Sequence, residues 1–210
     1  VAEALEARRS HGDSRGALAA LAYHFAAAAP VGGIERAIDY NLLAADSAAG
    51  ALAFGEAEAR FQVALELGIR EPGERVDVML RLGDACNRAG HADAALEAFR
   101  RATELARSLG DPEVLARAAI GFEQSAWRPS IHDSEAVELL EEATAALGED
   151  DSELRALGLS GLARALDLRG DSSRAAFVRD QSIAMSRRRA DPRTLAATLA
   201  MAYWARGSST

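Results

Sequence analysis

A helix-start signature that recurs at a fixed interval constrains this chain more than any other feature of its sequence. Asp111, Asp151 and Asp191 lie 40 residues apart, and proline directly follows the first and the third of them. Aspartate is a preferred N-cap because its carboxylate accepts from exposed N–H groups of the first helical turn, and proline is tolerated just after it. The recurrence predicts stacked helical units rather than one globular core.

A second marker predicts where the first helix of a unit ends. In three places a leucine precedes a glycine by eight residues: Leu82 and Gly90, Leu162 and Gly170, Leu199 and Gly207. Glycine closes helices because it adopts the left-handed C-cap conformation without steric cost. We therefore expect an all-α fold, a right-handed superhelical array of antiparallel helix hairpins with about four to five repeats.

One pair of expected helices carries the fullest repeat pattern. Leu82-Gly83 in its first helix is followed by Ala95, Phe99 and Ala102 in its second. This pattern resembles the tetratricopeptide repeat, in which small residues lie where helices cross and an aromatic ring fills the gap between hairpins. The resemblance implies a tetratricopeptide-like α-solenoid.

The neighbouring units keep the pattern more loosely. Ile120-Gly121 echoes Leu82-Gly83, and glycines 158 and 161 lie inside an expected helix as packing sites. Where the pattern expects phenylalanine and alanine, the fourth unit has Arg179 and Ser182. We expect a shifted register or a solvent-facing stretch there.

The repeats predict a single domain, residues 1–210. Its hairpins are expected at residues 1–29, 34–68, 74–109, 112–147 and 152–188, followed by a truncated last helix at 192–206. The missing second helix predicts an exposed apolar face near Leu199 and Tyr203, and pairing of two fragments through that face, as a homodimer, would be an artefact of the truncation.

Composition excludes several functional classes. The formal net charge is −8 and every basic residue other than histidine is arginine, so we expect no direct nucleic-acid binding and no lysine-based chemistry. A single cysteine, Cys86, rules out an internal disulfide, and no apolar run is long enough to span a membrane. We expect a cytoplasmic chain in which Cys86 is a buried, inert thiol.

The residues that carry chemistry do not form a catalytic pattern. The four histidines are scattered without metal-ligand spacing, and the carboxylate runs at residues 141–142 and 149–151 lack a partner base. We therefore expect no enzyme, no metal and no cofactor, and interpret the chain as a binding module.

The tetratricopeptide resemblance implies a groove lined by the first helices of successive hairpins. Its partner-binding positions, carried onto this sequence, are Asp84, Asn87, Arg88, Phe122, Arg164, Asp167, Met201 and Trp204. Trp127 and Trp204 offer the largest apolar anchors. The expected occupant is a protein or peptide partner, or a small-molecule inducer.

A more specific resemblance lies near the beginning of the chain. Residues 21–30, 35–40 and 57–65 together are similar to the helical region of large actinobacterial ATP-dependent transcriptional regulators of the LuxR type. This resemblance implies the sensor or interaction arm of such a regulator. The alternative is a free-standing tetratricopeptide scaffold that bridges partner proteins.

Overall fold

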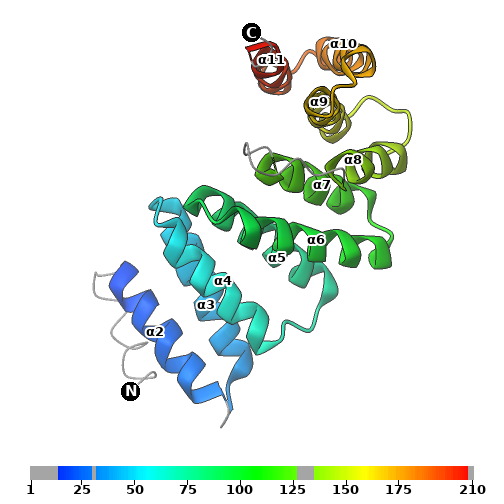
Figure 1. Cartoon of the computed structure of the whole chain (residues 1–210). Coiled ribbons are helices and arrows are strands. Elements are labelled where there is room, and N and C mark those ends of the chain that lie inside the picture. The colour runs from blue at the N-terminus through cyan, green and yellow to red at the C-terminus, as the bar shows by residue number, and fades with distance from the viewer. Residues whose placement is uncertain (1–13, 30–31, 127–134, 208–210) are drawn as a thin grey trace. The chain divides into compact units, whose positions relative to one another are not determined.

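The structure, a computed structural model, describes residues 14–29, 32–126 and 135–207, and these fold into helices without a strand (Figure 1). The helices are α2 (Ser14–Ala28), α3 (Ile34–Gly50), α4 (Phe54–Leu67), α5 (Pro72–Ala89), α6 (Ala92–Leu109), α7 (Pro112–Ala126), α8 (Glu135–Ala146), α9 (Glu153–Leu168), α10 (Ser172–Arg189) and α11 (Pro192–Gly207). Short connections join most of them into hairpins, which confirms the all-α hairpin array. Residues 1–13 of the first expected hairpin lie outside the described part.

The chain divides into two compact units, Val1–Ala98 and Phe99–Thr210, and the boundary falls inside α6. In the first unit α2 packs on α3, α3 on α4, and α4 on α5. The Phe25 and Tyr40 rings stack with centroids 5.0 Å apart between α2 and α3. Alanines 22, 37 and 44 are buried around these rings, so the helix backbones approach closely.

In the second unit, a glycine and a phenylalanine fix the packing of α7. Gly121 is buried on α7, and a β-carbon placed on it would overlap the Phe99 ring of α6. Phe99 itself is 2% exposed. This contact confirms that the aromatic ring fills the gap between hairpins and that a small residue receives it. Gly158 on α9 is a second position of close approach, because a β-carbon there would lie 2.9 Å from the Thr144 methyl group.

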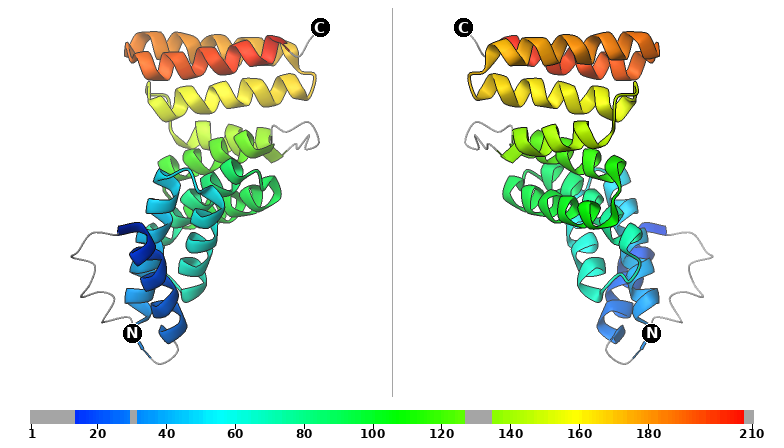
Figure 2. Two further views of the ribbon diagram at one scale, coloured as in Figure 1. Left: turned by 90° about the vertical axis from the view of Figure 1, so that its left-hand side faces the viewer. Right: turned by 90° about the vertical axis from the view of Figure 1, so that its right-hand side faces the viewer.

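The last hairpin keeps its register although its residues are polar. Figure 2 shows α9, α10 and α11 side by side along their length, in yellow, orange and red. Arg179 and Ser182 of α10 are 8% and 0% exposed, so the predicted register shift or solvent-facing stretch is wrong. Arg179 pairs with Asp167, and the Ser182 hydroxyl donates to the Ala156 carbonyl at 2.8 Å. Polar partners thus take the place of the expected apolar contacts at these two positions.

Two of the three expected aspartate caps are confirmed. Asp111 Oδ1 accepts from the N–H groups of residues 113 and 114, and Asp191 accepts from those of residues 193 and 194. The third prediction is wrong, because Ser152 caps α9 by accepting from the Arg155 N–H at 3.0 Å.

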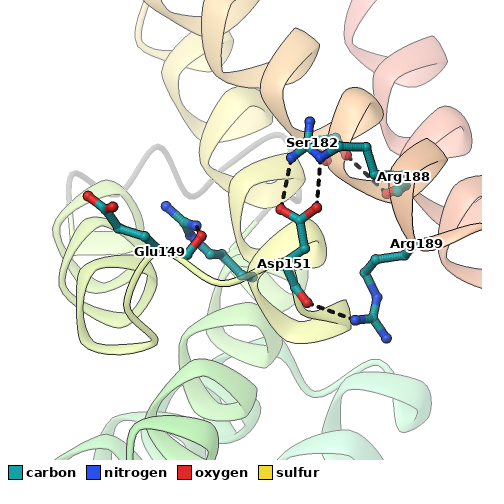
Figure 3. A network of polar contacts seen from close by, with 7 residues as sticks. Glu149, Asp151, Ser182, Arg188 and Arg189 are labelled. Carbon is teal, nitrogen blue, oxygen red and sulfur yellow. Dashed lines mark hydrogen bonds and ion pairs between the residues drawn. The ribbon is translucent and has the colours of Figure 1, made fainter.

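Asp151 instead ties the start of α9 to the end of α10. Its carboxylate accepts from Arg188 at 2.7 and 2.8 Å, and its backbone carbonyl accepts from Arg189 at 2.8 Å (Figure 3). The hydrogen bonds from Arg188 lower the pKa of the Asp151 carboxyl. Asp151 therefore forms a long-range ion pair with Arg188, although the local sequence predicts that it caps α9.

Replacing Gly121 with alanine tests the packing of α7. The new methyl group overlaps the buried Phe99 ring, so Gly121→Ala is expected to lower the free energy of unfolding by about 1–3 kcal/mol. Urea denaturation measures this change. Gly55→Ala on α4 is the control, because nothing lies within 4 Å of a β-carbon there and alanine favours helix. Equal loss at both positions contradicts the interlock.

Candidate interaction surface

Predicted groove residues on α5 lie on an accessible face of the first unit. Asp84 and Arg88 are exposed, and Asn87 is half-buried. The Arg88 guanidinium carbon lies 5.3 Å from the centroid of the Phe54 ring of α4, within cation–π range. The three side chains thus share the C-terminal half of α5, and the Arg88 head is held over α4. Their role in binding stays a prediction.

Sequence reasoning missed Arg81, which organises the same region. Its guanidinium pairs with Asp46 of α3 and with Asp77 one turn away on α5, and it lies 4.7 Å from the centroid of the Phe61 ring. One side chain therefore links three helices of the first unit.

Phe122 is a packing residue, so its predicted place on the groove surface is wrong. It is 0% exposed, and the Arg100 guanidinium covers its ring at 5.4 Å. The cause lies in its neighbour, because the close approach at Gly121 draws this side of α7 against α6. No part of the Phe122 ring is left for a partner.

Arg164 and Asp167 of α9 each have an internal partner. Arg164 donates to both carboxylate oxygens of Glu123 on α7, at 2.6 and 2.5 Å, and Asp167 pairs with Arg179. The Arg164 and Glu123 side chains are 12% and 2% exposed. Burial raises the pKa of the Glu123 carboxyl, and hydrogen bonding from Arg164 opposes that effect. Both predicted groove residues therefore already serve the packing of α9.

The remaining predicted positions lie at the edges of the described part. Met201 is half-buried on α11. The Trp204 side chain and all of Trp127 lie outside what the structure describes. The structure thus brings Asp84, Asn87 and Arg88 together on α5, whereas Arg164 and Asp167 are held in two different ion pairs of the second unit.

A surface cavity of about 290 Å³ lies between the second helices α6 and α8. It is lined by Arg100, Thr103, Glu104, Arg107, Glu135, Glu138, Leu139 and Glu142. Two bidentate ion pairs cross it: Arg100 with Glu135 at 2.9 and 2.8 Å, and Arg107 with Glu142 at 2.8 and 2.6 Å. We call this site the α6–α8 cavity.

The two ion pairs set the charge of the α6–α8 cavity. Hydrogen bonds from Arg100 and Arg107 lower the pKa of the Glu135 and Glu142 carboxyls respectively. Within the described part of the chain, Glu104 and Glu138 form no ion pair, and both are exposed. The cavity therefore offers two exposed carboxylates that are outside the ion pairs, beside two neutralised pairs.

The sequence contained a signal for this cavity that family reasoning passed over. Arg100 and Arg107 are seven residues apart on one helix, and Glu135 and Glu142 repeat that spacing 35 residues later. A seven-residue interval keeps two side chains on one helix face. Matching opposite charges one repeat apart therefore predict a ladder between the second helices, whereas the family pattern points to the first helices.

The one cysteine is unreactive. Cys86 is 1% exposed, and burial, followed by the nearby Glu58 carboxylate, raises the pKa of its thiol to about 12. Glu58 Oε2 also lies 2.7 Å from His91 Nδ1, within hydrogen-bond distance. This confirms a buried, inert thiol.

Two kinds of site are absent from the part of the chain that the structure describes. No three histidine, cysteine, aspartate or glutamate side chains there are arranged to hold a metal ion. In the same ranges, no helix has the length and apolar character needed to cross a bilayer.

No family model matches the sequence, and no curated protein matches it. Solved structures do resemble the fold. BtubC (BKLC) from P. vanneervenii aligns with a TM-score of 0.64 and 21% identity, covering 99% of this chain and 85% of its own. Rap protein complexed with Competence and Sporulation Factor aligns with a TM-score of 0.55 and 14% identity, covering 97% of this chain and 69% of its own. Both likenesses support the helical array.

The ion pair Arg107–Glu142 predicts a pH-dependent contribution to stability. The folded-state pKa of Glu142 is lowered, so its contribution is present above the unfolded pKa and is lost as pH falls through the folded one. Glu142→Gln should therefore reduce the free energy of unfolding by up to about 1 kcal/mol at about pH 7, and by progressively less as the pH falls toward about 3. Denaturant titration at both pH values measures this. The control Glu138→Gln should show no such dependence.

The buried pair Glu123–Arg164 predicts strong coupling in a double-mutant cycle. Glu123→Met leaves the Arg164 charge buried without that partner, so it should lower the free energy of unfolding by about 3–5 kcal/mol. Glu123→Met combined with Arg164→Met should lose less than Glu123→Met alone, because no uncompensated charge remains. Urea denaturation of all four chains tests this. Additive losses contradict the coupling.

Proposed function

We propose that this chain is a non-catalytic helical-repeat module that binds a protein or peptide partner. The observation that carries the proposal is the α6–α8 cavity, where Glu104 and Glu138 flank two closed ion pairs. Free carboxylates beside neutralised arginines accept hydrogen bonds from N–H groups and cationic side chains. The one hydroxyl in its lining, that of Thr103, donates to the Phe99 carbonyl at 2.9 Å and is therefore engaged within its own helix.

The α5 face of the first unit, formed by Asp84, Asn87 and Arg88, is a second surface for partner contact in this proposal. Its support is the exposure of Asp84 and Arg88. The fold likeness supports binding rather than reaction, since the Rap protein of similar fold is complexed with Competence and Sporulation Factor.

We further propose that the module serves as the interaction arm of a larger ATP-dependent transcriptional regulator. Support comes from the similarity of residues 21–30, 35–40 and 57–65 to the helical regions of such regulators. The alternative is a free-standing scaffold that bridges proteins. Sequencing the DNA on both sides of the coding segment discriminates between them. A phosphate-binding loop encoded upstream supports the arm, and a start codon directly before Val1 contradicts it.

Affinity capture with matched variants tests the binding proposal. The double variant Glu104→Gln/Glu138→Gln should reduce capture of the bound partner by at least about tenfold, because each lost charge-assisted hydrogen bond is worth about 1.5 kcal/mol or more. Quantitative mass spectrometry of captured proteins measures the loss. Glu56→Gln, an exposed carboxylate on α4, is the control.

Two results contradict the proposal. In the first, the unmodified chain captures no protein above the bare matrix. In the second, the double variant and Glu56→Gln capture equal amounts, which contradicts the α6–α8 cavity as the binding site. A selective loss in Arg88→Glu would assign the partner to the α5 face.

A further inference from the structure

The charged residues that line the α6–α8 cavity form three successive levels along the two helices. The levels are Arg100 with Glu135, Glu104 with Glu138, and Arg107 with Glu142. Steps of three or four residues keep the members on each helix on one face. The outer levels each hold an arginine against a glutamate, whereas the middle level has one carboxylate from each helix. Within the described residues, neither of these two carboxylates forms an ion pair.

The two outer ion pairs leave the middle level negatively charged. Arg100 and Arg107 are about 10 Å apart along α6, and each directs Nε and Nη2 to the glutamate of its own level. The hydrogen bond with Glu142 is the main cause of the raised pKa of Arg107, and attraction from Glu104 is a smaller one. The lining has four carboxylates and two guanidiniums, so the excess negative charge lies at the middle level.

The polar groups of the lining that lie outside the two ion pairs all accept hydrogen bonds. Glu104 and Glu138 are exposed carboxylates. Thr103 is 1% exposed, and its hydroxyl donates to the Phe99 carbonyl at 2.9 Å, which leaves its oxygen atom as an acceptor. A ligand group that suits these three residues carries donors only, together with a positive charge. Carboxylates and phosphates have the opposite character and would be repelled.

We propose that the α6–α8 cavity binds the side chain of an arginine from the partner protein, with its guanidinium at the middle level between Glu104 and Glu138. This inference rests on the proposed function, and it names the residue type that the same site recognises. A guanidinium has five N–H donors in a rigid planar fork, so one group can donate to carboxylates from two helices at once. Its three-carbon stem packs along Leu139, the apolar residue of the lining.

The size of the cavity and the chemistry of its lining favour arginine over lysine and over larger ligands. A volume of about 290 Å³ is at the lower end for ligand pockets, so the cavity admits one side chain. The lysine ammonium is a compact, strongly hydrated point charge with three donors, so it loses more hydration and satisfies fewer acceptors. Both outer levels already show the bidentate pairing of a guanidinium with a carboxylate.

Titration of the nitrogen-15-labelled 210-residue chain with capped tripeptides, followed by NMR, tests the proposal. The three probes have a central arginine, lysine or citrulline between glycines, and citrulline is the neutral analogue of arginine. The arginine peptide should shift the amide signals of residues 103, 104, 138 and 139 saturably, with a Kd on the order of 1 mM, since one side chain makes few contacts. The lysine peptide should bind at least about threefold more weakly. Equal binding of the citrulline or lysine peptide overturns the proposal.

Matched variants connect this binding to the middle level. Glu104→Gln/Glu138→Gln should weaken the arginine peptide at least about tenfold, because it removes the charge and keeps the shape. Glu113→Gln is the control, since Glu113 is exposed on α7 and lies outside the lining. The urea midpoint of the double variant should not fall, because neither carboxylate has an ion-pair partner in the described part of the chain. A lower midpoint, or equal affinities in the double variant and the control, contradicts the proposal.

The peptide titration and the capture experiment can fail separately. If Glu104→Gln/Glu138→Gln loses the captured partner but the arginine peptide does not bind, the proposed function stands and the assignment to arginine is overturned. If the arginine peptide binds at the middle level but the unmodified chain captures no protein, the arginine site stands and the proposed function fails.

Discussion

The contact between Phe99 and Gly121 is the constraint on which the second unit depends. The Phe99 ring occupies the volume where any other residue at position 121 would have its β-carbon. Because α7 lies this close to α6, Phe122 is sealed under Arg100. Arg100 then extends from α6 to Glu135 of α8, and so helps to frame the cavity. The absence of a side chain at Gly121 thus determines where Arg100 and Glu135 meet.

Ion pairs align neighbouring helices in the second unit, a task that interdigitating apolar side chains often perform in helical proteins. Arg100, Arg107 and Arg164 each bind their carboxylates through two parallel hydrogen bonds, which fix direction as well as distance. The exposed pairs contribute little to stability, whereas an unpaired Glu123 or Arg164 would be costly. Bidentate pairing therefore specifies which helices are neighbours more than it strengthens the fold.

Local sequence signals predicted the helices, and long-range competition explains where they failed. Asp111 and Asp191 cap their helices as expected, because nothing distant takes their carboxylates away from the backbone. At the third site Ser152 provides a second acceptor, so Asp151 is free to pair with Arg188, 37 residues later. This pairing of Asp151 cannot be predicted from the residues around the helix start alone.

The candidate site was harder to predict than the fold because the family pattern points to one face only. Asp84, Asn87 and Arg88 do share a face of α5, as their spacing predicts. The exposure of Phe122, in contrast, depends on a neighbouring glycine and a ring from another helix. The position of a residue in the repeat therefore predicts which way its side chain points, and the packing of neighbouring helices decides whether a partner can reach it.

The same repeat position is filled by Phe99 in one hairpin and by Arg179 in another, with different consequences. Phe99 of α6 packs against α7, which belongs to the next hairpin. Arg179 of α10 pairs with Asp167 of α9, within its own hairpin, and α11 meets its neighbours through threonine and serine hydroxyls. Among the side chains of α11 that the structure describes, residues 192–202, no apolar one is buried, so local opening should begin in this helix.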